Sequence, residues 1–115
     1  MDPGAWLARV RHDLVKHLLW PARDRREAGG KPAPGELVPR VIDAEGRPLG
    51  AAELWQALRA EAPRGLPLAA FDAAVARALA AAEAGDVAGV LALEEAVAAL
   101  ARQVEALARS LDAKD

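Results

Sequence analysis

Two interleaved series of apolar residues repeat every seven positions near the end of the chain. Valine or leucine occupies the first position of each heptad and leucine occupies the fourth. This arrangement is typical of an α-helix that packs along one face, and in parallel coiled coils it favours two strands. The residues of this heptad seam are Val90, Leu93, Val97, Leu100, Val104, Leu107 and Leu111. We expect a helix over residues 86–111, packed either on other helices of the same chain or on a second copy as a homodimer.

Proline and glycine divide the preceding sequence into further helices. Asp2 is expected to cap the first helix, with Pro3 at its first position. Pro21 should end or kink this helix, because proline lacks the backbone N–H that an interior position donates. Pro63 and Gly85 follow two later apolar stretches and should end them. The expected helices cover residues 1–28 with a kinked extension after Pro21, 51–62, 67–84 and 86–111.

Residues 29–50 differ from the rest, with four prolines and five glycines among them. This composition predicts a long loop between the first and second helices. It should contain a turn at 43–48 and a short extended piece within 37–42. A loop of this length in a compact domain is unusual and is often functional. The apolar residues expected to hold it against the helices are Leu37, Val38, Val41, Ile42 and Leu49.

These patterns predict an all-α fold, a single domain over residues 1–115 built as a small bundle of about four helices. Hydrophobic residues make up 53% of the chain, but many of them are alanine, which buries little area. The core should therefore depend on a limited set of larger side chains. They are Trp6, Trp20, Trp55, Phe71 and the leucines and valines.

Several classes of function are disfavoured by the residue types that the chain lacks. It has no cysteine, threonine or tyrosine and a single serine, Ser110, so few side chains can act as nucleophiles. We expect neither an enzyme of an ordinary type nor a cofactor. The first residues lack the basic region and apolar run of a secretory signal, and we expect no membrane span. Because the composition resembles that of GC-rich bacterial genomes, the default expectation is a cytoplasmic bacterial protein.

The charges of the chain are unevenly distributed. Residues 1–50 carry nine basic and seven acidic residues, whereas residues 51–115 carry six and ten. The basic excess is strongest in the 9–31 segment, beside Trp20, and it predicts a surface for an anionic partner. We expect a protein partner there, bound also by the 29–50 loop, with nucleic acid as an alternative partner. The candidate binding residues are Arg11, Lys16, Trp20, Arg23, Arg25 and Arg26.

Both histidines lie on the first expected helix. On a helical wheel, His12 points away from the apolar face and His17 lies at the edge of that face. Asp13 lies four residues before His17, so these two side chains are expected to pair. His12 and His17 are five residues apart and point to different sides, whereas a zinc pair on a helix needs a spacing of four. We therefore expect no metal site.

The segment Arg11-His12-Asp13-Leu14-Val15-Lys16-His17-Leu18 resembles the H-box of sporulation-type phosphotransferases and related sensor kinases, which often reads Arg-His-Asp-x-x-Asn-His-Leu. The chain has Lys16 where that pattern has asparagine. The resemblance implies that His12 accepts a phosphoryl group beside Asp13, and that the protein forms a dimeric four-helix bundle.

The function expected from the sequence is a non-catalytic protein–protein interaction or adaptor module of a bacterial cell. One alternative is a phosphotransfer domain in which His12 is the phosphoacceptor. A further alternative is a nucleic-acid-associated protein that uses the basic 9–31 segment.

Overall fold

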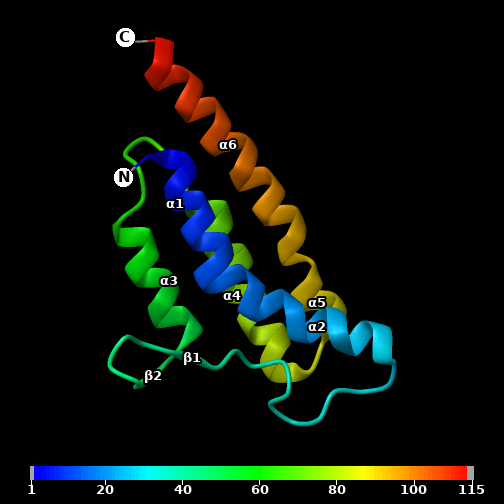
Figure 1. Ribbon diagram of the computed structural model, residues 1–115. Coiled ribbons are helices and arrows are strands. Elements are labelled where there is room, and N and C mark those ends of the chain that lie inside the picture. Colours follow the sequence, from blue (N-terminus) through cyan, green and yellow to red (C-terminus); the bar gives the residue numbers. More distant parts are fainter. Residues whose placement is uncertain (1, 114–115) are drawn as a thin grey trace.

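Helices account for most of the structure, which is a computed structural model describing residues 2–113 (Figure 1). The expected helical class is confirmed at this level. Two short strands are the remaining regular elements within the described residues. In chain order the elements are α1 (Pro3–Val10), the π-helical turn η1 (Arg11–Val15), α2 (Lys16–Ala28), β1 (Val41–Ile42), β2 (Pro48–Leu49), α3 (Ala51–Ala60), α4 (Ala69–Ala84), α5 (Val87–Leu91) and α6 (Leu93–Ala113).

The elements α1, η1 and α2 follow one another without a break and form one long helical run (Figure 1). The Asp2 carboxylate accepts a hydrogen bond from the backbone N–H of Ala5 (3.0 Å), so the expected N-cap is confirmed. Pro21 does not end the helix and lies inside α2. Leu19 and Ala22, on either side of it, are buried. Their packing offsets the backbone hydrogen bond that proline cannot make.

Glycine ends α2 and α4, as the sequence indicated. Gly29 has φ of 77° and Gly85 has φ of 72°, a region that favours glycine because it has no Cβ. The predicted boundaries of the connection before α4 are less accurate. Helix α3 ends at Ala60, two residues early, and α4 begins at Ala69, two residues late. Two prolines lie in this connection, and each restrains the residue before it away from helical geometry.

The segment between α2 and α3 contains an antiparallel hairpin in which Val41 pairs with Leu49. The Asp43 carboxylate closes its turn by accepting hydrogen bonds from the backbone N–H groups of Glu45 and Arg47 (3.0 and 2.9 Å). Between residues 37 and 42, the strand β1 covers Val41–Ile42 alone, so the short extended piece expected there occupies the end of that range.

Only part of the apolar set expected to hold this segment in place does so. Leu37 is buried in the core, and Val41 and Leu49 are half-buried. Val38 and Ile42 are exposed. In the short hairpin, alternate residues point to opposite faces, so Ile42 faces away from the side on which Val41 lies. The expectation was therefore wrong for Val38 and Ile42.

The helix expected over 86–111 is divided at Ala92 into α5 and α6. The Asp86 carboxylate caps α5 by accepting a hydrogen bond from the Gly89 N–H (3.0 Å). A Cβ added at Gly89 would lie 2.7 Å from the Cβ of Ala81, so glycine permits a close approach of α5 to α4. Helix α5 packs on α4 and α2, whereas α6 packs on α1 and α4. The division lets the two pieces follow different neighbours.

The heptad seam packs mainly within its own chain. Its buried members belong to one core cluster that also contains Trp6, Trp55 and Phe71. The seam residues Val90, Leu93, Leu100 and Val104 are buried, Val97 and Leu107 are partly buried, and Leu111 is 44% exposed. The far end of α6 extends beyond the other helices in Figure 1, which explains why burial decreases along the seam.

Trp20 is not a core residue, contrary to the expectation from composition. Its side chain is 58% exposed, whereas Leu14 and Leu18 on the same helical run are fully buried. Trp20 follows Leu18 by two residues, a rotation of about 200° around the helix. It therefore lies on the opposite side from the core-facing leucines.

Within residues 2–113, we find no helix with both the length and the apolar character needed to cross a membrane.

Candidate functional site

Trp20 separates two hollows on the surface of the protein. One has a volume of about 280 Å³ and lies between η1–α2 and α6, with Val15, Leu19 and Val97 among its lining residues. The other has a volume of about 360 Å³ and lies between α2 and residues 35–40. We call Trp20 and these two hollows the Trp20 face. It joins three segments that are distant in the sequence.

Lys16 holds a central position on the Trp20 face because it lines both hollows. Its Nζ lies 5.5 Å from the centroid of the Trp20 ring, within the range of a cation–π interaction. The same Nζ lies 3.2 Å from Nε2 of His12. Lys16 therefore links the exposed tryptophan to the exposed histidine.

The predicted binding residues are divided between two places. Arg11, Lys16, Trp20 and Arg23 line the same hollow beside α6. Arg25 and Arg26 instead line a separate hollow of about 520 Å³ next to α5. The two arginines lie near the end of α2, so helix geometry carries them away from Trp20. The structure brings together four of the six residues and not the other two.

Two of these arginines are paired with carboxylates from distant parts of the chain. Arg23 donates a hydrogen bond through Nε to Oε1 of Glu94 (2.9 Å). Arg25 donates through Nε to Oε2 of Glu36 (2.6 Å) and makes a second contact with the same carboxylate. This bonding lowers the pKa of Glu36 and raises that of Arg25. These ion pairs neutralise Arg23 and Arg25, two of the cations that the sequence analysis expected to bind a partner.

Glu94 and Val97 are members of the site that sequence reasoning did not assign to it. Both come from the first turns of α6 and line the hollow beside Trp20. Glu94 lies next to the heptad seam, and this position was a usable signal that it could reach a neighbouring helix. Nothing in the sequence identified that neighbour as α2.

His12 has both ring nitrogens engaged although its side chain is 73% exposed. Its Nδ1 lies 3.0 Å from Oδ1 of Asp13, and its Nε2 faces Lys16. The tautomer with the proton on Nδ1 satisfies both contacts, since Nδ1–H then donates to Asp13 and Nε2 accepts from Lys16.

Asp13 is not paired with His17, so that expectation was wrong. Its carboxylate contacts His12 and also Arg9, whose Nε lies 3.6 Å away. The Arg9 guanidinium is permanently charged and attracts this carboxylate. His17 is half-buried. Burial lowers its pKa, as do the charges of Lys16 and His12, while Asp13 opposes the shift.

Acidification should weaken the fold through His17. The unfolded chain takes up this proton near pH 6.5, whereas the folded protein takes it up at lower pH. The contribution of His17 to the free energy of unfolding is complete above pH 6.5 and is lost as pH falls through the folded pKa. Urea denaturation at about pH 7.5 and about pH 5 should show a smaller loss for His17→Gln than for the wild type. An equal loss in both proteins would contradict this assignment.

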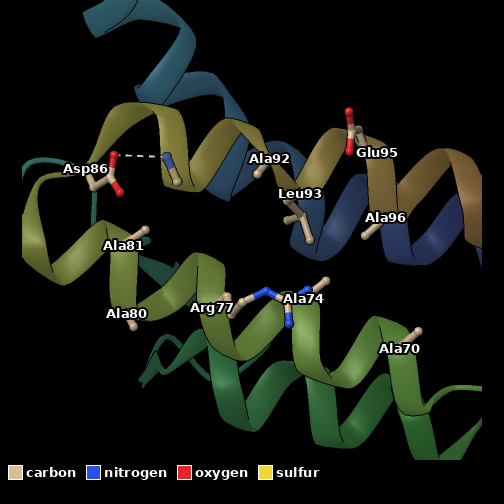
Figure 2. A pocket seen from close by; sticks show the side chains of 11 residues that line it. Ala70, Ala74, Arg77, Ala80, Ala81, Asp86, Ala92, Leu93, Glu95 and Ala96 are labelled. Atoms are coloured by element: carbon tan, nitrogen blue, oxygen red, sulfur yellow. Dashed lines mark hydrogen bonds between the residues drawn. The ribbon is translucent and has the colours of Figure 1, made fainter.

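A larger hollow of about 730 Å³ lies between α4 and α5–α6 (Figure 2). Figure 2 shows Ala92, Leu93 and Ala96 on one wall and alanines of α4 on the other. The charged residues of the lining are Arg77, Asp86 and Glu95, and Asp86 is already used to cap α5. Alanine has a small methyl side chain, which offers a partner neither a hydrogen bond nor a charge. This hollow therefore holds no grouping with a defined chemistry.

Within residues 2–113, no three or more histidine, cysteine, aspartate or glutamate side chains are grouped closely enough to hold a metal ion. In comparisons with known proteins, no family model, no curated protein and no solved structure matches the chain. The function must therefore be argued from the Trp20 face and from His12.

Proposed function

We propose that this protein is a non-catalytic interaction or adaptor module of a bacterial cell, and that it binds its protein partner through the Trp20 face. The observation that carries the proposal is the 58% exposure of Trp20 between two hollows. Tryptophan is among the residues that contribute most to binding when a partner covers them. The exposed ring and the hollows on its two sides offer a partner a large aromatic contact.

Val38 strengthens the proposal from the loop side. It is exposed and lines the hollow on the other side of Trp20, together with Pro39 and Arg40. The 29–50 segment therefore contributes apolar area to the same face as the first helix. The binding surface expected from the sequence combined the same two parts, the 9–31 segment and residues 29–50.

Removal of the tryptophan ring should abolish partner capture. Full-length Trp20→Ala protein, used as bait in the cell extract, should lose the partner that wild type retains. Ile42→Ala is the matched control, since Ile42 is also exposed but lies outside both hollows. Quantitative mass spectrometry of the captured proteins measures the difference. Equal recovery with Trp20→Ala and wild type would exclude the Trp20 face as the binding surface.

A second candidate function, phosphoryl transfer through His12, is favoured by one specific observation. The Nδ1 of His12 is held by Asp13, which leaves the Nε2 lone pair beside the Lys16 ammonium. Attack by Nε2 on a phosphorus atom would form an N–P bond as the donor's bond to phosphorus breaks. For this attack the Lys16 ammonium would move from Nε2 to a phosphoryl oxygen, which frees the lone pair and places its charge where it stabilises the transferred group.

Chemical phosphorylation with phosphoramidate tests this candidate without a cognate kinase. We expect acid-labile phosphate on Nε2 of His12, detected by ³¹P NMR, and slower labelling of Lys16→Ala. His17→Ala serves as the control and should be labelled like wild type. Equal labelling of wild type and His12→Ala would remove His12 as the phosphoacceptor.

We retain the homodimer suggested by the heptad seam as a proposal only for contacts at the exposed end of the seam. Its support is Leu111, which continues the seam at the projecting end of α6 and remains exposed. The nucleic-acid alternative has less support, because Arg23 and Arg25 of the basic segment already have carboxylate partners.

A further inference from the structure

The hollow between η1–α2 and α6 has the size and lining of a site for a peptide side chain. Val15 and Leu19 are buried along its first wall, and Val97 is half-buried on the α6 wall. Its volume of about 280 Å³ lies below the roughly 300–1,000 Å³ typical of small-molecule sites. An apolar side chain from a partner could lie against these residues and the Trp20 ring.

The charges around Trp20 are not balanced. Arg11, Lys16 and Arg40 have no carboxylate within ion-pairing distance among residues 2–113. Asp24 lines the hollow beside residues 35–40, and its carboxylate also has no cationic partner among residues 2–113. The remaining acidic residues of the two hollows, Glu36 and Glu94, are neutralised by arginines. The Trp20 face therefore carries a net positive charge.

We infer that the partner bound by the Trp20 face is an acidic peptide segment whose apolar side chains enter the hollows on either side of Trp20. The inference rests on the proposed interaction function and specifies the chemistry of the partner. Electrostatic complementarity requires carboxylates opposite Arg11, Lys16 and Arg40. The apolar lining requires hydrophobic side chains between those carboxylates.

The lining favours a peptide over nucleic acid. A nucleic-acid site combines several phosphate-binding cations with aromatic or base-reading side chains along a groove. Here the floor is aliphatic, and Arg23, which lies in the same hollow, is held by Glu94. Carboxylates on a chain with leucine-like anchors match both the aliphatic floor and the free cations.

Selection from a random peptide display library on the full-length protein tests the inference without knowledge of the natural partner. We expect enriched peptides to carry more aspartate and glutamate than lysine and arginine, with apolar residues between the acidic ones. Affinity of a synthesised winner should fall about tenfold or more for Trp20→Ala, as for a residue central to an interface. It should also weaken as salt is raised, because salt screens the exposed charges.

Charge reversal provides the matched comparison. The double variant Arg11→Glu/Lys16→Glu should lose the acidic peptides, whereas Arg102→Glu, on the exposed surface of α6 and outside both hollows, should bind them like wild type. Circular dichroism confirms that each surface variant is folded before binding is measured.

The possible outcomes separate the inference from the function on which it rests. Neutral or basic peptides that bind in a Trp20-dependent manner would overturn the acidic partner and leave the interaction function standing. Absence of any Trp20-dependent peptide would overturn both. A duplex oligonucleotide that binds wild type, is lost with Arg11→Glu/Lys16→Glu and has no acidic-peptide competitor would replace the inference with nucleic-acid binding.

Discussion

Replacing Trp6 by alanine should lower the free energy of unfolding by about 3–5 kcal/mol, the usual cost of truncating a buried aromatic side chain. Trp6 is 0% exposed, and its indole N–H donates a hydrogen bond to the carbonyl of Leu58 (2.8 Å). Its ring centroid lies 6.3 Å from that of Trp55. The side chain therefore joins α1 to α3, and its loss leaves a cavity and removes one of the two hydrogen bonds to the Leu58 carbonyl, which also accepts from the backbone N–H of Glu61 (3.1 Å). Urea denaturation measures the effect.

Two further variants separate the contribution of the Trp6 hydrogen bond from that of its buried ring. Trp6→Phe keeps an aromatic ring but removes the indole hydrogen bond to the Leu58 carbonyl, which still accepts from the Glu61 N–H, at a cost of about 0.5–1.5 kcal/mol. Trp20→Ala, on the solvent side, should change the free energy of unfolding by about 0.5 kcal/mol or less. Similar losses for Trp6→Ala and Trp20→Ala would contradict the division between a core tryptophan and a solvent-exposed one.

Replacing Leu93 by alanine should lower the free energy of unfolding by about 2–5 kcal/mol, because Leu93 is a buried member of the heptad seam. Leu111→Ala should cost far less, since Leu111 lies at the exposed end of the same seam. The comparison uses the same substitution at two positions of one seam, Leu93 at the fourth position of its heptad and Leu111 at the first. It measures the intrachain packing of α6 directly.

Sedimentation of the same two variants tests the homodimer. If the seam packs within one chain, the stability of Leu93→Ala is independent of protein concentration, and Leu111→Ala affects self-association alone. Comparable destabilisation by both substitutions, together with concentration-dependent unfolding of the wild type, would instead place the whole seam at a dimer interface.

Local signals predicted the helices well where a single residue decides the outcome. Asp2 caps α1 and Gly85 ends α4, because each effect depends on one side chain or one backbone angle. Pro21 was harder to interpret. Its local cost favours a break, but the burial of neighbouring residues outweighs that cost, and burial is a property of the assembled fold.

The division between α5 and α6 also depends on contacts that periodicity does not contain. The heptad repeat continues from Val90 to Leu93 without interruption, so the sequence predicted one helix. The break at Ala92 separates α5, where Gly89 packs closely on Ala81 of α4, from α6, which packs on α1 and α4. That contact joins residues on two different helices.

The spacing of apolar residues and the positions of proline and glycine determined the helical class, the helix ends at glycine and the seam of α6. These features follow from backbone geometry within a few residues. The seam's partner, the outward position of Trp20 and the pairing of Arg23 with Glu94 were decided by the tertiary structure. The physical reason is that an ion pair or a buried face depends on the distance between segments far apart in the chain. In the folded protein, carboxylates neutralise Arg23 and Arg25 of the basic stretch around Trp20, whereas Arg11 and Lys16 have no carboxylate within ion-pairing distance among residues 2–113.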